Sequence, residues 1–264
     1  DSQPEAIGGY LPLSKVYSFN PVPDTLSAEK VGLVYGVQAN LFTEYIPTPE
    51  HAEMMIYPRV LALAEVAWSA PSKKNYEDFH VRALKAVEEL KKSGYNPFEL
   101  KNEIGNRPGA DKPVEHLAVG KKVTYGLDAV YYPGYAAGGD TALVDGVRGG
   151  WTYGDKRWQG FIDKKRMDIT IDLEKETELH FIGADFMQVC GPEVFMPAEV
   201  IISISDDGKD FTELKHIEHK VVKDDKVTFT NFGWEGNAKG RYVRYQATSG
   251  EFGGFLFTDE VVIK

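Results

Sequence analysis

Two different periods of hydrophobic residues divide the chain. Between about residues 51 and 93, apolar positions recur every three or four residues, which is typical of helices that pack on one face. Beyond about residue 115, apolar and polar positions alternate over short segments, which is typical of strands with one buried face. The change of period predicts an α/β domain followed by an all-β domain.

The α/β part begins with one strand and continues into helices. GLVYGVQANLF, residues 32–42, is an apolar run of strand length and indicates a strand buried on both faces, as in a parallel sheet. Pro58 suits the first turn of a helix, Asn75 an N-cap and Gly94 a C-cap. Two apolar stripes support the helices: Leu61, Ala64 and Trp68, and then Phe79, Ala83, Ala86, Val87 and Leu90.

The all-β part follows a region without apolar periodicity. We place a linker at residues 101–114, between an N-terminal domain at 1–100 and a β-domain at 115–264. Asp207 and Gly208 form a hairpin turn signal, because this pair tolerates positive φ. The predicted strands are 167–173, 178–186, 198–205, 226–232, 241–248 and 255–264. Short strands without helices predict a β-sandwich or jelly roll.

Glu44 lies where the predicted strand of residues 32–42 runs out. Ligands of parallel α/β sheets bind at the carboxyl ends of strands, so an acid there is a candidate site residue. Two structural alternatives stay open on spacing alone. Glu44 could favour the dipole of the next helix, or it could form a salt bridge with Arg59.

Charge and composition exclude several classes of partner. The formal net charge is -10, and the sequence has no Lys/Arg cluster that could neutralise a row of phosphates. We therefore expect neither nucleic acid nor anionic membrane surfaces as partners. No apolar run approaches the roughly 20 residues of a membrane span. The chain starts without Met or a signal peptide, which suggests removal of an upstream piece. Cys190, the single cysteine, is expected to be a small buried apolar residue.

Three N-terminal stretches together resemble a known enzyme family. They are PEAIGGYLPLSKVYSFNPVP, GVQANLFTEYI and YPRVLALAEVAW. They are similar to the last part of the catalytic (β/α)8 barrel of family 20 glycoside hydrolases, the β-N-acetylhexosaminidases that include bacterial chitobiases. Phe42-Thr43-Glu44 stands at the family's Trp-x-Glu motif, and Ala64 to Trp68 matches its Ala-Glu-x-x-Trp pattern. The resemblance covers roughly residues 3 to 95.

The resemblance implies roles for two residues. Glu44 would accept hydrogen bonds from hydroxyls of the terminal sugar, and such charge-assisted bonds discriminate between sugars. Phe42 would stack on the sugar ring, with both side chains on one face of the strand. The family usually has Trp at the stacking position, so Phe42 offers a smaller platform.

The family's chemistry implies that this chain does not hydrolyse glycans by itself. The substrate's acetamide is the nucleophile, an Asp-Glu pair on an earlier strand supplies the orienting group and the acid, and catalysis needs no cofactor. The single Asp-Glu dipeptide here, Asp259-Glu260, lies in the last β-domain segment. We therefore expect the catalytic pair to be missing from this chain.

The β-domain resembles coagulation-factor type C (discoidin-like) domains and family 32 carbohydrate-binding modules. GGDTALVDGVRGGWTYGDKRWQGF, MPAEVIISISDDGKDF and GRYVRYQATSGEFGGFLFTDEVVIK carry the resemblance. The fold is an eight-stranded jelly roll that often holds one structural calcium ion. By that resemblance Asp145, Glu260 and Asp140 are candidate calcium ligands, since calcium prefers oxygen ligands. Alternatively, Asp145 caps a turn and Glu260 is solvated.

Aromatic residues in loops are the candidates for glycan binding. A sugar needs an exposed ring flanked by polar groups, and Phe252, Trp151 and Tyr153 lie in Gly-rich loops. Trp158 matches a core position of the fold, so we favour its burial. His216 and His219 point to opposite faces of one strand, which favours solvated or packing roles over a metal site.

Two hypotheses from different classes follow. The first is the C-terminal part of a periplasmic, cell-surface or secreted β-N-acetylhexosaminidase that acts on N-acetylhexosamine-containing oligosaccharides, with an appended glycan-binding domain. The second is a non-catalytic carbohydrate-binding or cell-surface adhesion module. An acidic pair on an upstream barrel strand would distinguish the first from the second.

Overall fold

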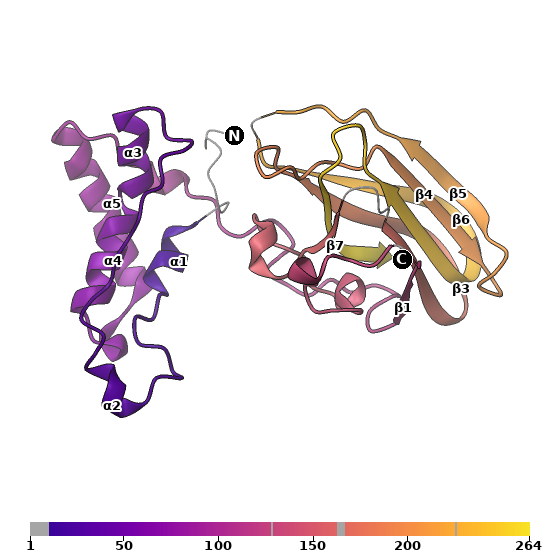
Figure 1. Cartoon of the computed structure of the whole chain (residues 1–264), viewed down its shortest axis with the longest axis horizontal. Helices are drawn as coiled ribbons and strands as arrows, with labels where there is room; N and C mark the ends of the chain where they lie inside the picture. Colours follow the sequence, from indigo (N-terminus) through magenta and orange to yellow (C-terminus); the bar gives the residue numbers. More distant parts are fainter. Residues whose placement is uncertain (1–10, 128, 163–166, 225) are drawn as a thin grey trace. The chain divides into compact units, whose positions relative to one another are not determined.

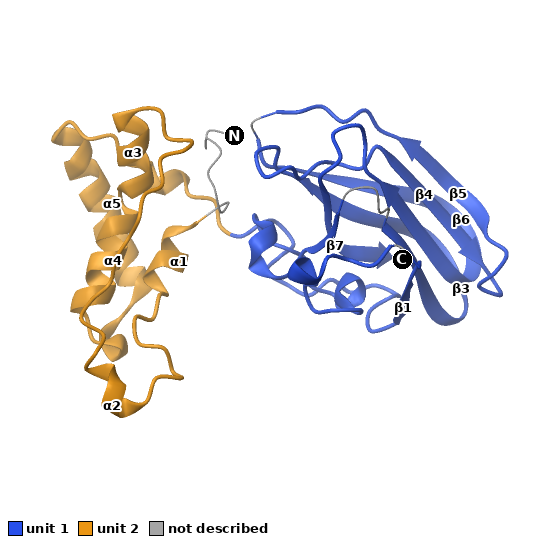
Figure 2. Ribbon diagram, viewed as in Figure 1, with its two compact units in different colours: residues 1–9, 106–264 blue, residues 10–105 orange. Residues whose placement is uncertain are grey.

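The chain folds as two compact units. The computed structural model describes residues 11–127, 129–162, 167–224 and 226–264. A helical unit lies within residues 10–105, and a β unit is built on residues 106–264 (Figure 2). The boundary after Gly105 falls inside the segment that the sequence marks as a linker.

The helical unit packs its short helices around a small apolar core. Its helices are α1 (Leu13–Tyr17), α2 (Ala28–Val31), α3 (Pro49–Ile56), α4 (Arg59–Trp68), η1 (Pro71–Lys73), α5 (Tyr76–Lys92) and η2 (Leu100–Asn102) (Figure 1). Its buried core consists of Leu13, Tyr17, Ala62, Phe79, Ala83, Val87 and Leu100. The core therefore joins α1, α4, α5 and η2.

Helix α5 confirms the signals in its sequence. The Asn75 side chain accepts a hydrogen bond from the backbone N–H of Asp78 at 3.1 Å, so it is the N-cap. The C-cap is Ser93, and the predicted Gly94 follows it at φ 87°, a conformation that glycine adopts without strain. The apolar stripe that begins at Phe79 faces the core, as its spacing predicts.

The prediction of a buried strand at residues 32–42 is wrong. The backbone of residues 34–43 has no regular secondary structure, and Tyr35 is 92% exposed. A parallel strand needs neighbouring strands to pair its backbone, and none lies in the described part of the helical unit. An apolar run can be buried, but only where neighbouring elements cover it.

The first predicted helical stripe is also wrong. Trp68 is 91% exposed and Ala64 is exposed, while Ala62 and Val66 are the buried residues of α4. Pro58 precedes α4 and separates it from α3. The buried face of α4 is thus the one that reaches α1 and α5.

The β unit is an antiparallel sandwich. Its strands are β1 (Lys122–Tyr125), β2 (Gln159–Ile162), β3 (Met167–Gln188), β4 (Glu199–Ser205), β5 (Thr212–Glu218), β6 (Thr228–Thr248) and β7 (Phe255–Ile263). The order is β2-β7-β3-β6-β4-β5, with β1 also paired to β3. Short 3-10 turns, η3 (Pro133–Tyr135), η4 (Ala142–Val144) and η5 (Tyr153–Asp155), interrupt the loops before β2. The predicted segments 167–173 and 178–186 are one long strand, as are 226–232 and 241–248.

Long strands β3 and β6 contribute to both layers of the sandwich (Figure 1). The first half of β3 pairs with β1 and with the end of β6, which in turn pairs with β4. The second half of β3 pairs with β7 and with the start of β6. Register shifts after Asp172 and Leu179 mark the bend.

Alternation along β3 separates the core from the outer face. Ile169 and Ile171 are fully buried in the main core, with Tyr245 and Phe186. Thr170 between them and Asp172 after them are only half-buried, and Asp172 accepts two hydrogen bonds from Arg241, both at 2.8 Å. The two-residue period therefore predicts the buried face over residues 169–173, whereas residues 182–184 and 186–188 are buried on both faces.

The turn between β4 and β5 also confirms its sequence signal. Gly208 has φ 74°, and Asp207 Oδ1 accepts hydrogen bonds from the backbone N–H of Lys209 and of Asp210. These bonds hold the pKa of Asp207 at about 2, Asp210 contributing most. The turn thus depends on an ionised carboxylate.

Candidate functional site

Phe42 and Glu44 lie in an exposed segment of the helical unit. Phe42 is 72% exposed, and Glu44 sits in a turn closed by the bond from Ile46 N to Thr43 O. Glu44 forms no ion pair with a described residue, Arg59 included, so the salt-bridge alternative is wrong. The structure does not give the two side chains a common pocket.

A groove of about 600 Å³ lies elsewhere in the helical unit. It is bounded by the segment that includes Phe19 and Pro21, by the extended segment at Val34 and Tyr35, and by α4 at Val66. Phe42 and Glu44 do not line it. The groove is largely apolar and holds no cluster of catalytic side chains.

Glu65 of the Ala-Glu-x-x-Trp pattern joins three helices. It accepts a hydrogen bond from the Tyr17 hydroxyl at 2.9 Å and forms a two-pronged ion pair with Arg82. The Arg82 guanidinium lowers the pKa of Glu65 against the opposing effect of burial. Within the described residues this motif acid therefore stabilises the contacts of α1, α4 and α5.

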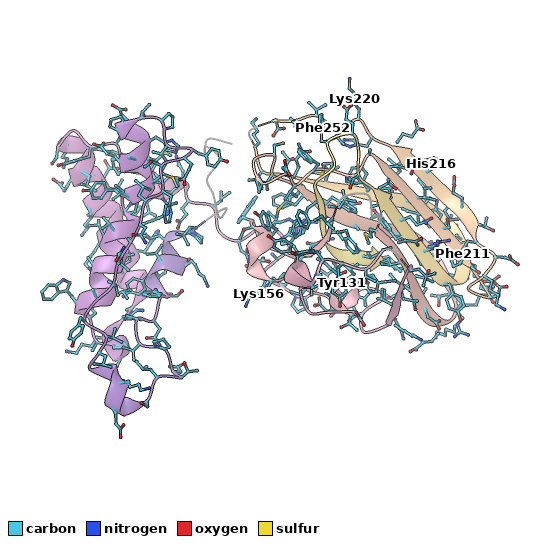
Figure 3. The ribbon with its side chains drawn as sticks, in the orientation of Figure 1. Tyr131, Lys156, Phe211, His216, Lys220 and Phe252 are labelled. Carbon is cyan, nitrogen blue, oxygen red and sulfur yellow. The ribbon has the colours of Figure 1, made fainter. Side chains whose placement is uncertain are left out.

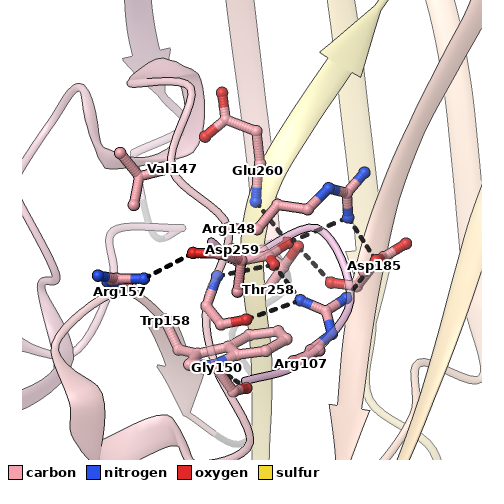
Figure 4. A network of polar contacts seen from close by, with 12 residues as sticks. Arg107, Val147, Arg148, Gly150, Arg157, Trp158, Asp185, Thr258, Asp259 and Glu260 are labelled. Atoms are coloured by element: carbon pink, nitrogen blue, oxygen red, sulfur yellow. Dashed lines mark hydrogen bonds and ion pairs between the residues drawn. The ribbon is translucent and has the colours of Figure 1, made fainter. Parts of the chain in front are cut away.

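Asp259 and Glu260 are adjacent in β7, yet their carboxylates have different partners. Asp259 accepts hydrogen bonds from Arg107 Nη1 at 2.6 Å and from the backbone N–H of Gly149 at 3.0 Å. Glu260 binds His116 instead, and its side chain extends away from Arg107 (Figure 4). The dipeptide is thus not a catalytic acid pair.

Arg107 is the centre of a buried charge network (Figure 4). It is 5% exposed and pairs with Asp259 and Asp185, and Arg148 pairs with Asp185 as well. Its guanidinium also lies 4.9 Å from the ring centroid of Trp158. Burial raises the pKa of Asp259 to about 6, while Arg107 acts in the opposite direction. The sequence does not mark Arg107 as a site residue, because Arg107 lies in the predicted linker.

Glu260 has one satisfied and one unsatisfied carboxylate oxygen. Its Oε1 lies 2.6 Å from His116 Nε2 and accepts the backbone N–H of Gly146 at 2.9 Å. Its Oε2 is buried without a hydrogen-bond partner. Burial raises the pKa of Glu260, and the nearby carboxylate of Asp145 adds to this effect. Glu260 is fully buried, so its reading as a solvated residue is wrong.

The other two candidate calcium ligands differ in their surroundings. Asp145 Oδ1 accepts the backbone N–H of Val147 at 2.8 Å, so this residue does cap a turn. Asp140 Oδ1 accepts the hydroxyl of Tyr131 at 2.7 Å. Among the described residues, no three His, Cys, Asp or Glu side chains gather closely enough to hold a metal. Backbone carbonyls would have to supply the further oxygens of a calcium site.

Phe252 lies on the loop before β7 and keeps part of its ring exposed (Figure 3). It is 37% exposed, and the ammonium group of Lys223 lies 4.3 Å from its ring centroid. Gly253 and Gly254 follow it at positive φ, and a Cβ at Gly254 would lie 2.2 Å from the Glu193 carbonyl oxygen. The loop conformation that presents Phe252 therefore requires glycine at position 254.

The other two candidate aromatics, Tyr153 and Trp151, are more deeply packed than Phe252. Tyr153 stacks on Phe257 with ring centroids 4.8 Å apart, and Trp151 is half-buried beside Phe229. Trp158 is 1% exposed and donates to the Gly150 carbonyl at 3.2 Å, which confirms its predicted burial. Phe252 is the candidate that combines a partly exposed ring with a cation over that ring.

Residues 128–261 match the sequence model of the F5/8 type C domain. The chain belongs to the F5/8 type C domain family. Residues 1–71 match the catalytic domain of glycosyl hydrolase family 20, so the N-terminal part is a portion of that domain. These two matches confirm both family resemblances and the order of the domains.

Two curated relatives are similar to a part of the chain. A "Beta-hexosaminidase" of Porphyromonas gingivalis is 46% identical over 94 residues, which are 36% of this chain and 12% of that protein. A "Beta-N-acetylhexosaminidase" of Cellulomonas fimi is 32% identical over 74 residues, which are 28% of this chain and 15% of that protein. The chain thus spans only a small fraction of the length of these relatives.

Solved structures similar to the type C domain include two sugar-binding modules. One is a chitosan-binding module from a chitosanase/glucanase of Paenibacillus sp. IK-5, with 15% identity and a TM-score of 0.39 over 57% of this chain and 98% of that one. Another is a fucose-binding module of Streptococcus pneumoniae, with 19% identity and a TM-score of 0.41 over the same shares.

In the described part of the chain, no helix combines the length and the apolar character that a membrane span requires.

The remaining residues of interest in the type C domain have structural roles. His216 pairs with Glu199 across the strands at 2.9 Å, whereas His219 packs edge-on against Phe232. These contacts confirm that the two histidines do not share a site. Cys190 is half-buried, so its predicted burial is only partly met. It lies in a turn in which Glu193 N donates to the Cys190 carbonyl at 3.1 Å.

Proposed function

We propose that the type C domain binds glycans that end in N-acetylhexosamine and that Phe252 is the aromatic platform of the site. The observation that carries the proposal is the half-exposed Phe252 ring with the Lys223 ammonium group 4.3 Å from its centroid. The apolar face of a sugar packs on such a ring, and the ammonium group donates hydrogen bonds to sugar oxygens. A location outside the cytoplasm is part of the proposal, because that is where such glycans are met.

Calorimetry of the whole chain with N,N′-diacetylchitobiose, guided by a glycan array, tests this proposal. We expect Phe252→Ala to weaken binding about tenfold or more, which corresponds to the ~1.4 kcal/mol that stacking supplies. Tyr132→Ala is the matched control, since Tyr132 is 44% exposed in the same domain. Equal affinities of the two variants, or no binding by the unmodified chain, would contradict the proposal.

We further propose that the parent enzyme, a polypeptide with the complete catalytic domain, removes terminal N-acetylhexosamine from glycans. In it Glu44 accepts hydrogen bonds from the terminal sugar and Phe42 packs on the sugar ring. The support is the family 20 match to residues 1–71 and the 46% identity to a "Beta-hexosaminidase". Both side chains are exposed in the present chain and so are accessible to further partners.

Turnover of a chromogenic N-acetylglucosaminide by that longer polypeptide tests the enzymatic part. Glu44→Gln should lower kcat/KM by about 10- to 100-fold, because it removes a charged acceptor of sugar hydroxyls. Glu29→Gln, an exposed acid in α2, is the control. Glycan binding without turnover by the unmodified protein would instead favour a non-catalytic carbohydrate-binding or adhesion module.

A structural calcium ion at Asp145 and Glu260 completes the proposal. The buried Oε2 of Glu260 has no partner, and the Asp145 carboxylate lies near enough to raise the pKa of Glu260. A buried carboxylate, Glu260, with the exposed carboxylate of Asp145 near it favours a cation that compensates their charge. The donor set of carboxylates and turn carbonyls fits calcium.

A further inference from the structure

His116 contacts Glu260, one of the two carboxylates of the proposed calcium site. Its side chain is fully buried, and its Nε2 atom lies 2.6 Å from Glu260 Oε1. Backbone hydrogen bonds of the neighbouring residues join this segment to the Asp145 turn and to β7. Val114 N binds the Gly146 carbonyl at 2.8 Å, and Leu117 N binds the Ile263 carbonyl at 2.8 Å. The segment around His116 therefore connects the Asp145 turn to β7.

The hydrogen bonds of His116 define where its proton lies. The backbone N–H of Ala118 points to Nδ1 at 3.3 Å, and a backbone N–H can only donate. Nδ1 is thus the acceptor of the ring, and the ring proton is on Nε2, where it is donated to Glu260 Oε1. In this tautomer the imidazole is neutral, so it orients the carboxylate of Glu260 without neutralising it.

Glu260 Oε1 is saturated by two donors, while Oε2 has none. His116 Nε2 and Gly146 N both donate to Oε1. Oε2 is buried and unpartnered, which costs free energy unless a cation or donor reaches it. The arrangement fixes the carboxylate so that one specified oxygen is left available for a ligand.

We propose that His116 is a positioning residue of the calcium site: it fixes Glu260 through Oε1 and leaves Oε2 to bind the ion. This inference rests on the proposed calcium site and adds a residue that the ligand set does not include. Hydrogen bonds to a ligating carboxylate fix its orientation, and loss of such an outer partner lowers metal affinity by about 10- to 100-fold. No chemical step is assigned to His116.

Calcium binding by the whole chain tests the inference, with calorimetry and the shift of the unfolding temperature between EDTA and calcium chloride as readouts. We expect His116→Ala to weaken calcium binding by about 10- to 100-fold. His116→Gln should retain most of the affinity, because a glutamine amide can donate to Glu260 and accept from Ala118. His180→Ala is the control, since His180 is exposed and contacts Asn237.

The outcomes separate the site from the role of His116. No calcium binding by the unmodified chain would overturn the calcium site itself. Binding by the unmodified chain and equal binding by His116→Ala would overturn only the positioning role. If His116→Ala does not fold, nitrogen NMR of the unmodified, calcium-loaded chain decides: a proton on Nε2 alone supports the inference, and a proton on Nδ1 overturns it.

Discussion

The β unit and the helical unit differ in how far each satisfies its own backbone and apolar surface. In the β unit every strand pairs with another strand of the same chain, and buried residues between Ala118 and Ile263 form one large main core. In the helical unit residues 34–43 are extended without strand partners, and Tyr35, Phe42 and Trp68 are largely exposed.

An apolar run is buried only where neighbouring elements cover it. In the type C domain, the strands with alternating apolar and polar residues pair with one another within about 150 residues of sequence. The segment of residues 32–42 belongs to a portion of a catalytic domain, and a parallel strand depends on elements that are distant in sequence. The same kind of apolar run is therefore buried in one unit and exposed in the other.

Arg107 gives the largest expected effect in the β unit. Arg107→Met leaves Asp259 and Asp185 without their buried cation, and breaking a buried pair in this way costs about 3 to 5 kcal/mol of unfolding free energy. Urea unfolding followed by near-UV circular dichroism measures it. Lys239→Met is the control, because its pair with Glu176 is exposed and should contribute little to stability. Equal losses in both variants would show that the network is not buried.

Within the helical unit, the rings of Phe79 and Trp68 differ in burial. Phe79→Ala removes a ring that is 3% exposed and should cost about 3 kcal/mol. Trp68→Ala removes a ring that is 91% exposed and should change the stability by less than about 0.5 kcal/mol. Thermal unfolding followed by helical circular dichroism compares the two. A large loss for Trp68→Ala would mean that this ring is covered in solution.

Asp207 gives a smaller, pH-dependent effect. Its folded pKa of about 2 lies below the ordinary 3.8, so its contribution is present above about pH 4 and is lost as the pH falls toward 2. Asp207→Asn should lower the unfolding temperature by roughly 2 to 4 °C at pH 7, with the difference shrinking below pH 4. Asp206→Asn, an exposed neighbour, is the control. A difference that does not change with pH would contradict this role.

Local signals in the sequence predict much of the fold. The Asn75 cap, the Asp207-Gly208 turn and the alternation along β3 depend on neighbouring residues, and all three are confirmed. The polar site residues depend on distant partners. Arg107 is 152 residues from Asp259, and His116 is 144 residues from Glu260. Nothing near them in sequence marks either residue as buried, so only the fold reveals their roles.

Backbone hydrogen exchange of the whole chain tests the contrast between the units most directly. We predict that amides of residues 35–42 exchange at nearly the rate of an unstructured peptide, because none of them donates to a described backbone carbonyl. Amides in the paired regions of β3 and β6 should be protected until the β unit unfolds as a whole. Strong protection of residues 35–42 in this chain would contradict the account, since it would require strand partners that the structure does not give them.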